Sequence, residues 1–107
     1  MTINEYLEKW RVVEKIAGID REFLKVRPLI TCEDGFKISV QASETHYCTP
    51  RSNRGPYSKV ECGYPSEREK DLLDYAEEPN NPTDTVYGWV PVDIIDAVIE
   101  KHGGIAK

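Results

Sequence analysis

Three cysteines and two histidines are the residues best suited by type to bind a metal or to act in catalysis. Cys32, His46, Cys48 and Cys62 are acceptable zinc ligands. Their spacing contains no Cys-x-x-Cys pair, and a strand between Cys32 and His46 would separate them by roughly 25 Å at about 3.3 Å per residue. We therefore expect no metal and no cofactor, with Cys32 and Cys62 as small buried hydrophobic residues.

Cys48 is also a candidate nucleophile, because His46 stands two residues before it. In an extended segment both side chains point the same way, but an i,i+2 pair needs a bend for a direct hydrogen bond. No neighbouring group is placed to orient the imidazole. We favour an ordinary polar loop and expect no enzymatic activity, with Cys48 catalysis as the third alternative. His102 is expected to interact favourably with the helix dipole at a helix C-terminus.

Basic and aromatic residues are interspersed between positions 46 and 59. Guanidinium groups and aromatic rings together can stack on bases or hold a phosphate group. A solvated loop that balances its acidic neighbours is the simpler interpretation. The residues of this candidate ligand loop are His46, Tyr47, Arg51, Arg54, Tyr57 and Lys59.

Acidic residues are concentrated between positions 67 and 84, where seven acidic residues stand against two basic ones. This excess equals the formal net charge of the whole chain, -5. The stretch is either a solvent-facing helix and loop or a docking face for a basic partner. Tyr75 is expected to be exposed there, and Trp89 to be buried. The candidate acidic face comprises Glu67, Glu69, Asp71, Asp74, Tyr75, Glu77 and Glu78.

The elements that would position these residues begin with a helix. Thr2 and Glu5 have the spacing of a capping box, and apolar residues follow at helical intervals. This pattern predicts a helix over residues 3–17, with Gly18 as its left-handed C-terminal residue.

Strands follow the helix. Alternation over residues 23–32 predicts an edge strand containing Pro28, and Asp34-Gly35 predicts a tight hairpin turn into a strand over residues 36–43. Residues 44–56 are predicted to form a long loop, and residues 57–64 another strand.

The last third alternates between helix and strand. Ser66 and Glu69 form a second predicted capping box, opening a helix that runs to residue 76. A strand over residues 85–90 and a helix from Pro91 to Gly103 complete the chain. The sequence therefore predicts one small α+β domain over residues 1–107, in the order α-β-β-β-α-β-α. An antiparallel sheet of about four strands would pack against the helices.

Length and charge set further bounds. A chain of 107 residues can bury one core without disulfides. A net charge of -5 disfavours binding to nucleic acid or anionic membranes. No stretch reaches the roughly 20 apolar residues of a membrane span, and the N-terminus is too polar for a signal peptide. The odd cysteine number indicates reduced thiols, so we expect a cytoplasmic protein.

Several short segments resemble uncharacterised small proteins encoded by bacteriophages and prophages. The matching segments are Asp34-Gly35-Phe36, Ser39 to Ser43, His46-Tyr47-Cys48, Pro50-Arg51, Val60 to Ser66, Tyr75-Ala76-Glu77, Thr85 to Pro91, and Lys101 to Gly104. No activity is established for such proteins, so the resemblance assigns no catalytic residue. It implies a location in the cytoplasm of a bacterial host, where small acidic phage proteins often bind host or defence complexes; anti-CRISPR proteins are the best-known class.

We therefore expect a phage-encoded, non-enzymatic binding protein whose acidic face engages a host or defence protein, with a CRISPR effector as one instance. The alternative is a small-ligand or nucleic-acid-binding module that uses the loop from Tyr47 to Lys59. The identity of the partner and the oligomeric state stay open at this point.

Overall fold

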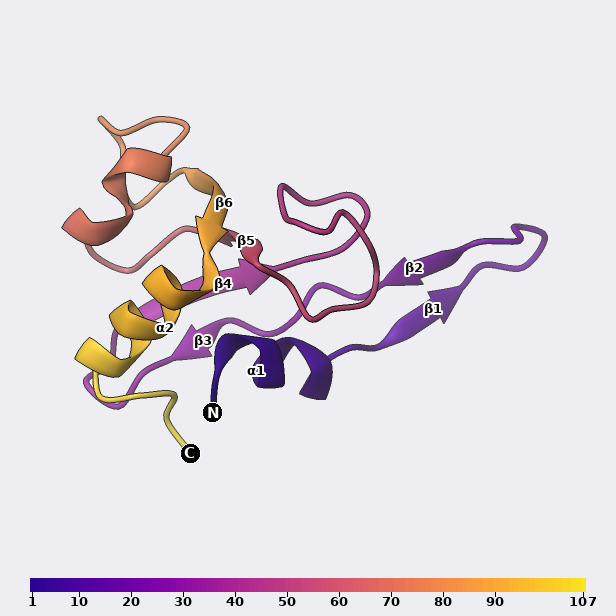
Figure 1. Ribbon diagram of the computed structural model, residues 1–107, viewed down its shortest axis with the longest axis horizontal. Helices are drawn as coiled ribbons and strands as arrows, with labels where there is room; N and C mark the ends of the chain where they lie inside the picture. The colour runs from indigo at the N-terminus through magenta and orange to yellow at the C-terminus, as the bar shows by residue number, and fades with distance from the viewer.

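A four-stranded antiparallel sheet forms the centre of the computed structural model, which describes residues 1–107 (Figure 1). Its strands lie in the order β3 (Ile30–Thr31), β4 (Lys37–Gln41), β5 (Lys59–Gly63) and β6 (Val86–Pro91). Alternate residues of a strand share one face of the sheet, so each strand contributes apolar side chains to the core. The predicted hairpin turn is confirmed: Gly35 has a φ of 95°, in the left-handed region that favours glycine.

The two α-helices, α1 (Ile3–Lys9) and α2 (Val92–Lys101), lie side by side against the sheet (Figure 1). The backbone N–H of Ile3 donates to the Asp96 carboxylate at 2.7 Å, which joins the start of α1 to α2. The predicted capping box of Thr2 and Glu5 is formed. One cluster of 19 buried residues unites helices and sheet, so the prediction of a single α+β domain is confirmed.

The first helix is much shorter than predicted. It ends at Lys9, and the following segment forms a hairpin of β1 (Val13–Lys15) and β2 (Glu22–Leu24) that extends away from the body (Figure 1). β-Branched Val12 and Val13 favour extended backbone, and an apolar helical face here would have no core to cover. The apolar periodicity over residues 10–17 was therefore misleading.

The single strand predicted over residues 23–32 is interrupted. β2 ends at Leu24 and β3 begins at Ile30, with Pro28 in the break. Proline cannot donate a ladder hydrogen bond, and the intervening Arg27 turns inward, with its residue only 3% exposed. The break thus buries a charged side chain.

The predicted second α-helix is a 3-10 helix, η1 (Lys70–Tyr75), and its predicted capping box is wrong. Ser66 instead pairs with β4: its hydroxyl accepts from the Lys37 N–H, and its own N–H donates to the Lys37 carbonyl. Glu69 is the N-cap residue, and its side chain accepts from the Asp71 N–H at 3.1 Å. A long-range contact has replaced the local cap.

The C-terminal elements follow the prediction closely. The strand and the helix appear as β6 and α2, with Pro91 one position earlier than expected, as N-cap. Gly103 and Gly104, both at positive φ, follow the helix end. None of the helices has both the length and the apolar character needed to cross a membrane.

Candidate functional site

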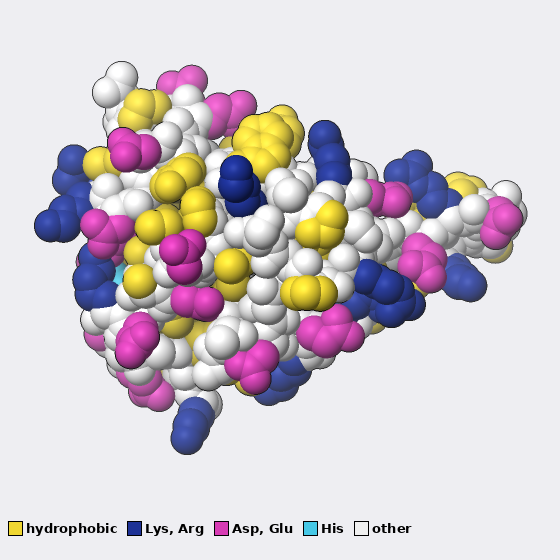
Figure 2. Space-filling model, in the orientation of Figure 1, with side chains coloured by type: hydrophobic (Ala, Val, Ile, Leu, Met, Phe, Trp, Pro, Cys, Tyr) yellow, Lys and Arg dark blue, Asp and Glu magenta, His cyan; other side chains and the backbone are white.

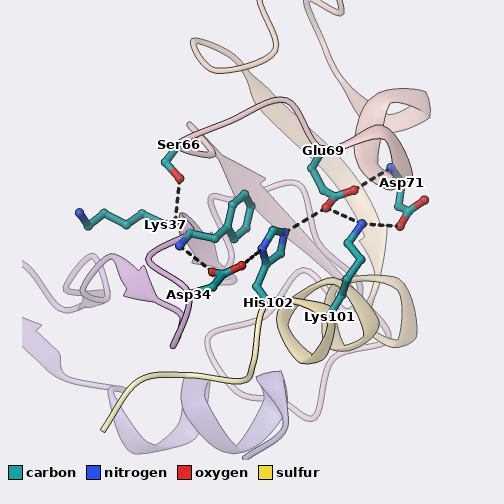
Figure 3. A network of polar contacts seen from close by, with 8 residues as sticks. Asp34, Lys37, Ser66, Glu69, Asp71, Lys101 and His102 are labelled. Atoms are coloured by element: carbon teal, nitrogen blue, oxygen red, sulfur yellow. Dashed lines mark hydrogen bonds and ion pairs between the residues drawn. The ribbon is translucent and has the colours of Figure 1, made fainter.

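The predicted acidic face is partly internal. Glu69 is only 4% exposed and lies between two cationic side chains (Figure 3). The Lys101 ammonium approaches its Oε1 at 2.7 Å, and His102 Nε2 lies 3.1 Å from the same oxygen. Lys101 also pairs with Asp71 at 3.1 Å. Glu69 therefore cannot contact a partner, which corrects its assignment to an exposed docking face.

His102 connects three segments of the chain. Its Nδ1 lies 2.6 Å from the Asp34 carboxylate in the β3–β4 turn, and its Nε2 faces Glu69 (Figure 3). Its ring stacks on Phe36 with the ring centroids 4.0 Å apart. Burial alone would lower the pKa of His102, but the hydrogen bonds to Asp34 and Glu69 outweigh burial and raise it. With both ring nitrogens facing carboxylates, the His102 ring braces the structure when protonated and has no free nitrogen to act as a base. The sequence-based assignment to the helix dipole missed these partners.

The remaining predicted acidic residues are exposed. Glu67, Asp74, Glu77 and Glu78 are at the surface and form no ion pair. Acidic side chains are not confined to this segment, however, because Figure 2 shows them spread across the whole visible face. Negative charge by itself therefore does not mark a docking site on this molecule.

A hollow of about 440 Å³ brings part of the acidic face together with part of the ligand loop. We call it the aromatic hollow; its lining residues are Tyr47, Asp74, Tyr75, Ala76, Glu77, Val86, Gly88 and Trp89. Tyr47 and Trp89 stack with ring centroids 4.8 Å apart. Two carboxylates thus lie at the edge of an exposed aromatic pair.

The hollow lies beside an irregularity in β6. The register shifts between Val60 and Cys62, so Gly88 and Trp89 stand where regular pairing is lost. Trp89 has a φ of 49°, in the left-handed region that is strained for a non-glycine residue, and it is 48% exposed. Its N–H donates to the Tyr47 carbonyl at 3.0 Å, which fixes the two aromatic residues together.

Two burial predictions were wrong at this place. Trp89 was expected in the core but is exposed, and Tyr75 was expected at the surface but packs partly against the core. Regular alternation in β6 would have placed Trp89 on the buried side with Tyr87, whereas Tyr75 lies at the end of η1 and packs against the core from there. The positive φ of Trp89 leaves no specific signature in the sequence, but a glycine within a strand pattern, here Gly88, is a recognised signal of a bulge.

The candidate ligand loop does not form one site. Tyr47 belongs to the aromatic hollow, whereas Arg54 and Tyr57 line a separate cleft beside α1. His46 is half-buried and bonded to Ser43, and Arg51 lies over the Tyr47 ring, 5.9 Å from its centroid. Lys59, at the start of β5, is exposed and lines neither the aromatic hollow nor the cleft beside α1.

The cysteines lie in the core. All three are buried and free, and Cys48 is hydrogen bonded to the carbonyls of Ser43 and Pro50. Burial raises the pKa of the Cys48 thiol, which works against a reactive thiolate. No group of three or more His, Cys, Asp or Glu side chains in residues 1–107 is arranged to hold a metal ion.

Comparison with protein families, with curated proteins and with solved structures finds no match for this chain. Its function must therefore be argued from its own geometry.

Proposed function

We propose that this protein is a non-enzymatic binding protein that seats a basic side chain of a partner protein in the aromatic hollow. The observation that carries the proposal is the exposed Tyr47–Trp89 stack beside Asp74 and Glu77. A guanidinium or ammonium group is attracted to the face of an aromatic ring, most strongly to Trp. Neighbouring carboxylates add charge-assisted hydrogen bonds.

The chain itself contains an example of the proposed contact. The Arg51 guanidinium lies 5.9 Å from the centroid of Tyr47, within the range of a cation–π interaction. Trp89 remains 48% exposed, so part of the aromatic pair is available to a second cation. This arrangement favours arginine, whose planar group can stack on a ring and pair with carboxylates at once.

The hollow is also pre-organised. Tyr47 is held at its N–H by the Glu61 carboxylate and at its carbonyl by the Trp89 N–H. Side chains fixed before binding lose less conformational entropy when a partner docks. Strained backbone at Trp89 is consistent with a functional position, because strain tends to persist where function requires it.

The resemblance to phage and prophage proteins suggests the class of partner to test. A host or defence protein complex in the bacterial cytoplasm, with a CRISPR effector as one instance, has basic surfaces that normally contact nucleic acid. An acidic, aromatic hollow would compete for such arginine residues. The proposal for the hollow depends on its geometry, and the choice of partner depends on the resemblance.

Intrinsic fluorescence gives a direct test of the hollow. The chain has two tryptophans, so Trp10→Phe leaves Trp89 as the only indole. Titration of this variant with a capped Gly-Arg-Gly peptide should produce a saturable fluorescence change, and the citrulline analogue, which lacks the charge, should produce none. An equal response to both peptides would contradict a cation site.

Charge reversal tests whether the hollow serves a protein partner. Asp74→Lys with Glu77→Lys should weaken capture of a host partner at least tenfold. Glu67→Lys with Asp84→Lys is the matched control, because it changes net charge equally within the same acidic segment but outside the hollow. Equal loss in both double variants would indicate long-range charge alone and reject a specific contact.

A further inference from the structure

A second concave site lies on a different part of the surface, between α1 and residues 54–57. This cleft has a volume of about 710 Å³, within the range of small-molecule sites. Four basic residues line it, against two acidic ones, Glu5 and Glu8. The basic residues are Lys9, Arg11, Arg27 and Arg54.

Arg27 is a buried charge without a counter-ion. The residue is 3% exposed, and its Nε and Nη1 donate to the carbonyls of Leu7 and Ala42 at 3.2 and 2.6 Å. Neither acceptor is charged, and no carboxylate lies within 4.0 Å of the guanidinium. Burial of an unpaired charge is costly, so a bound anion would stabilise this position.

Arg11 has an unsatisfied donor in the same cleft wall. Its side chain is 10% exposed, and its Nε donates to the Asn53 carbonyl at 2.8 Å. Its Nη2 is buried and makes no hydrogen bond, although it forms an ion pair with the Glu22 carboxylate at 3.6 Å. Of these two largely buried guanidinium groups, Arg27 thus lacks a counter-ion and Arg11 lacks a hydrogen-bond acceptor for one nitrogen.

Arg54 contributes a third guanidinium from the loop. It is exposed, and its side chain makes no hydrogen bond or ion pair. Glu5 is occupied by the Thr2 N–H, which leaves Glu8 as the free carboxylate of the lining. The cleft therefore carries an excess of positive charge on a protein whose net charge is negative.

We infer that this cleft binds the phosphate group of a small molecule. The three arginines can supply several N–H donors to one phosphate, whose double negative charge matches theirs better than a single carboxylate does. Glu5 and Glu8 in the lining, together with the net charge of -5, oppose a long polyanion such as nucleic acid. The inference is independent of the proposed function, because the cleft shares no residue with the aromatic hollow.

Titration of the full chain with inorganic pyrophosphate, followed by calorimetry and by NMR of the arginine Nε–Hε signals, tests the inference. We expect saturable binding that shifts the Arg11 and Arg27 signals. Arg54→Ala should weaken binding at least tenfold without loss of folding, since this exposed side chain makes no hydrogen bond or ion pair within the protein. Arg68→Ala, an exposed arginine outside the cleft, is the matched control and should bind as the unmodified chain does.

Three results would overturn the inference. The first is absence of saturable pyrophosphate binding, and the second is equal weakening by Arg54→Ala and Arg68→Ala, which would indicate general electrostatic attraction. The third is tighter binding of a ten-nucleotide oligothymidylate than of pyrophosphate in the cleft, which would make the nucleic-acid backbone the source of the phosphate. Trp89→Ala should leave pyrophosphate binding unchanged, so this result can be separated from the test of the aromatic hollow.

Discussion

At the scale of single residues, His102 and Trp89 show how position determines what a side chain does. His102 is surrounded by carboxylates on both sides, so its charge stabilises the fold. Trp89 is held at the surface by a strained backbone and stacks on Tyr47. Both residues occupy positions where a simpler role, a dipole cap or a core aromatic, was expected from sequence.

The cross-brace at His102 predicts a fall in stability as pH rises. The pKa of His102 in the folded protein is raised above its ordinary value of 6.5. Its contribution to the free energy of unfolding is therefore complete below pH 6.5 and is lost as pH rises through the pKa of the folded form. Urea unfolding between pH 5.5 and 8.5 should show this loss. His102→Gln should remove the pH dependence and cost roughly 1–3 kcal/mol at pH 5.5, because buried Glu69 loses a partner.

His46 supplies the control with the opposite sign. Burial lowers the pKa of His46, so the folded form resists protonation and stability from this group rises with pH up to about 6.5. His46→Gln should therefore remove a rise in stability below pH 6.5 and leave the fall above pH 6.5 unchanged. If the free energy of unfolding of His102→Gln fell with pH as steeply as that of the unmodified protein, the cross-brace would be contradicted.

The backbone of Trp89 predicts an unusual order of substitutions. Glycine tolerates a φ of 49° but alanine does not. Trp89→Gly and Trp89→Ala both lose the aromatic stack, yet the glycine variant should be more stable by about 1 kcal/mol. Chemical denaturation of the two variants checks this, and the order usual in strands, with alanine more stable, would show that the residue is unstrained.

At the scale of elements, the β1–β2 hairpin is the clearest departure from local expectation. Apolar residues recur over 10–17 at helical spacing, but most of them are exposed, including Val12 and Ile16. Without a surface to bury them, the β-branched side chains and the turn at Gly18 favour a hairpin. The helix before it ends as soon as its contacts with the core end.

Val13 distinguishes the hairpin from the predicted helix. In β1 it pairs with Leu24, and Val13→Ala should lower the free energy of unfolding by about 0.5–1 kcal/mol. In a helix the same change would raise it by about 0.6 kcal/mol, because alanine is the better helix former. Urea unfolding of the variant shows whether the free energy of unfolding falls or rises. Glu14→Ala, next to it and exposed, should change stability by less than about 0.5 kcal/mol.

At the scale of the whole molecule, one core carries two separate concave surfaces of opposite character. The aromatic hollow is flanked by carboxylates near η1 and β6, and the arginine-lined cleft lies beside α1. Acidic residues are distributed over the body and the hairpin (Figure 2). Net charge is thus a poor guide to function here, because each site depends on a few side chains in a local setting.

A single core predicts a single cooperative unfolding transition. Trp10→Phe leaves an indole in β6, and Trp89→Phe leaves one at the end of α1. Urea curves from the two variants, each compared with circular dichroism of the same variant, should coincide between probes. Fluorescence of Trp10 that changes before the circular dichroism would indicate that α1 unfolds separately from the sheet.

The fold class, the Asp34-Gly35 hairpin, β6 and α2 could be predicted from the sequence alone, since they depend on local backbone preference and on periodicity. The burial of individual charges, the exposure of Trp89 and the grouping of loop residues into sites depend on packing between distant segments. Glu69 with His102, and Arg27 beside Arg11, are brought together by packing between segments far apart in the chain. Local sequence patterns do not predict contacts between residues far apart in the chain, so the candidate sites could be identified only in the folded structure.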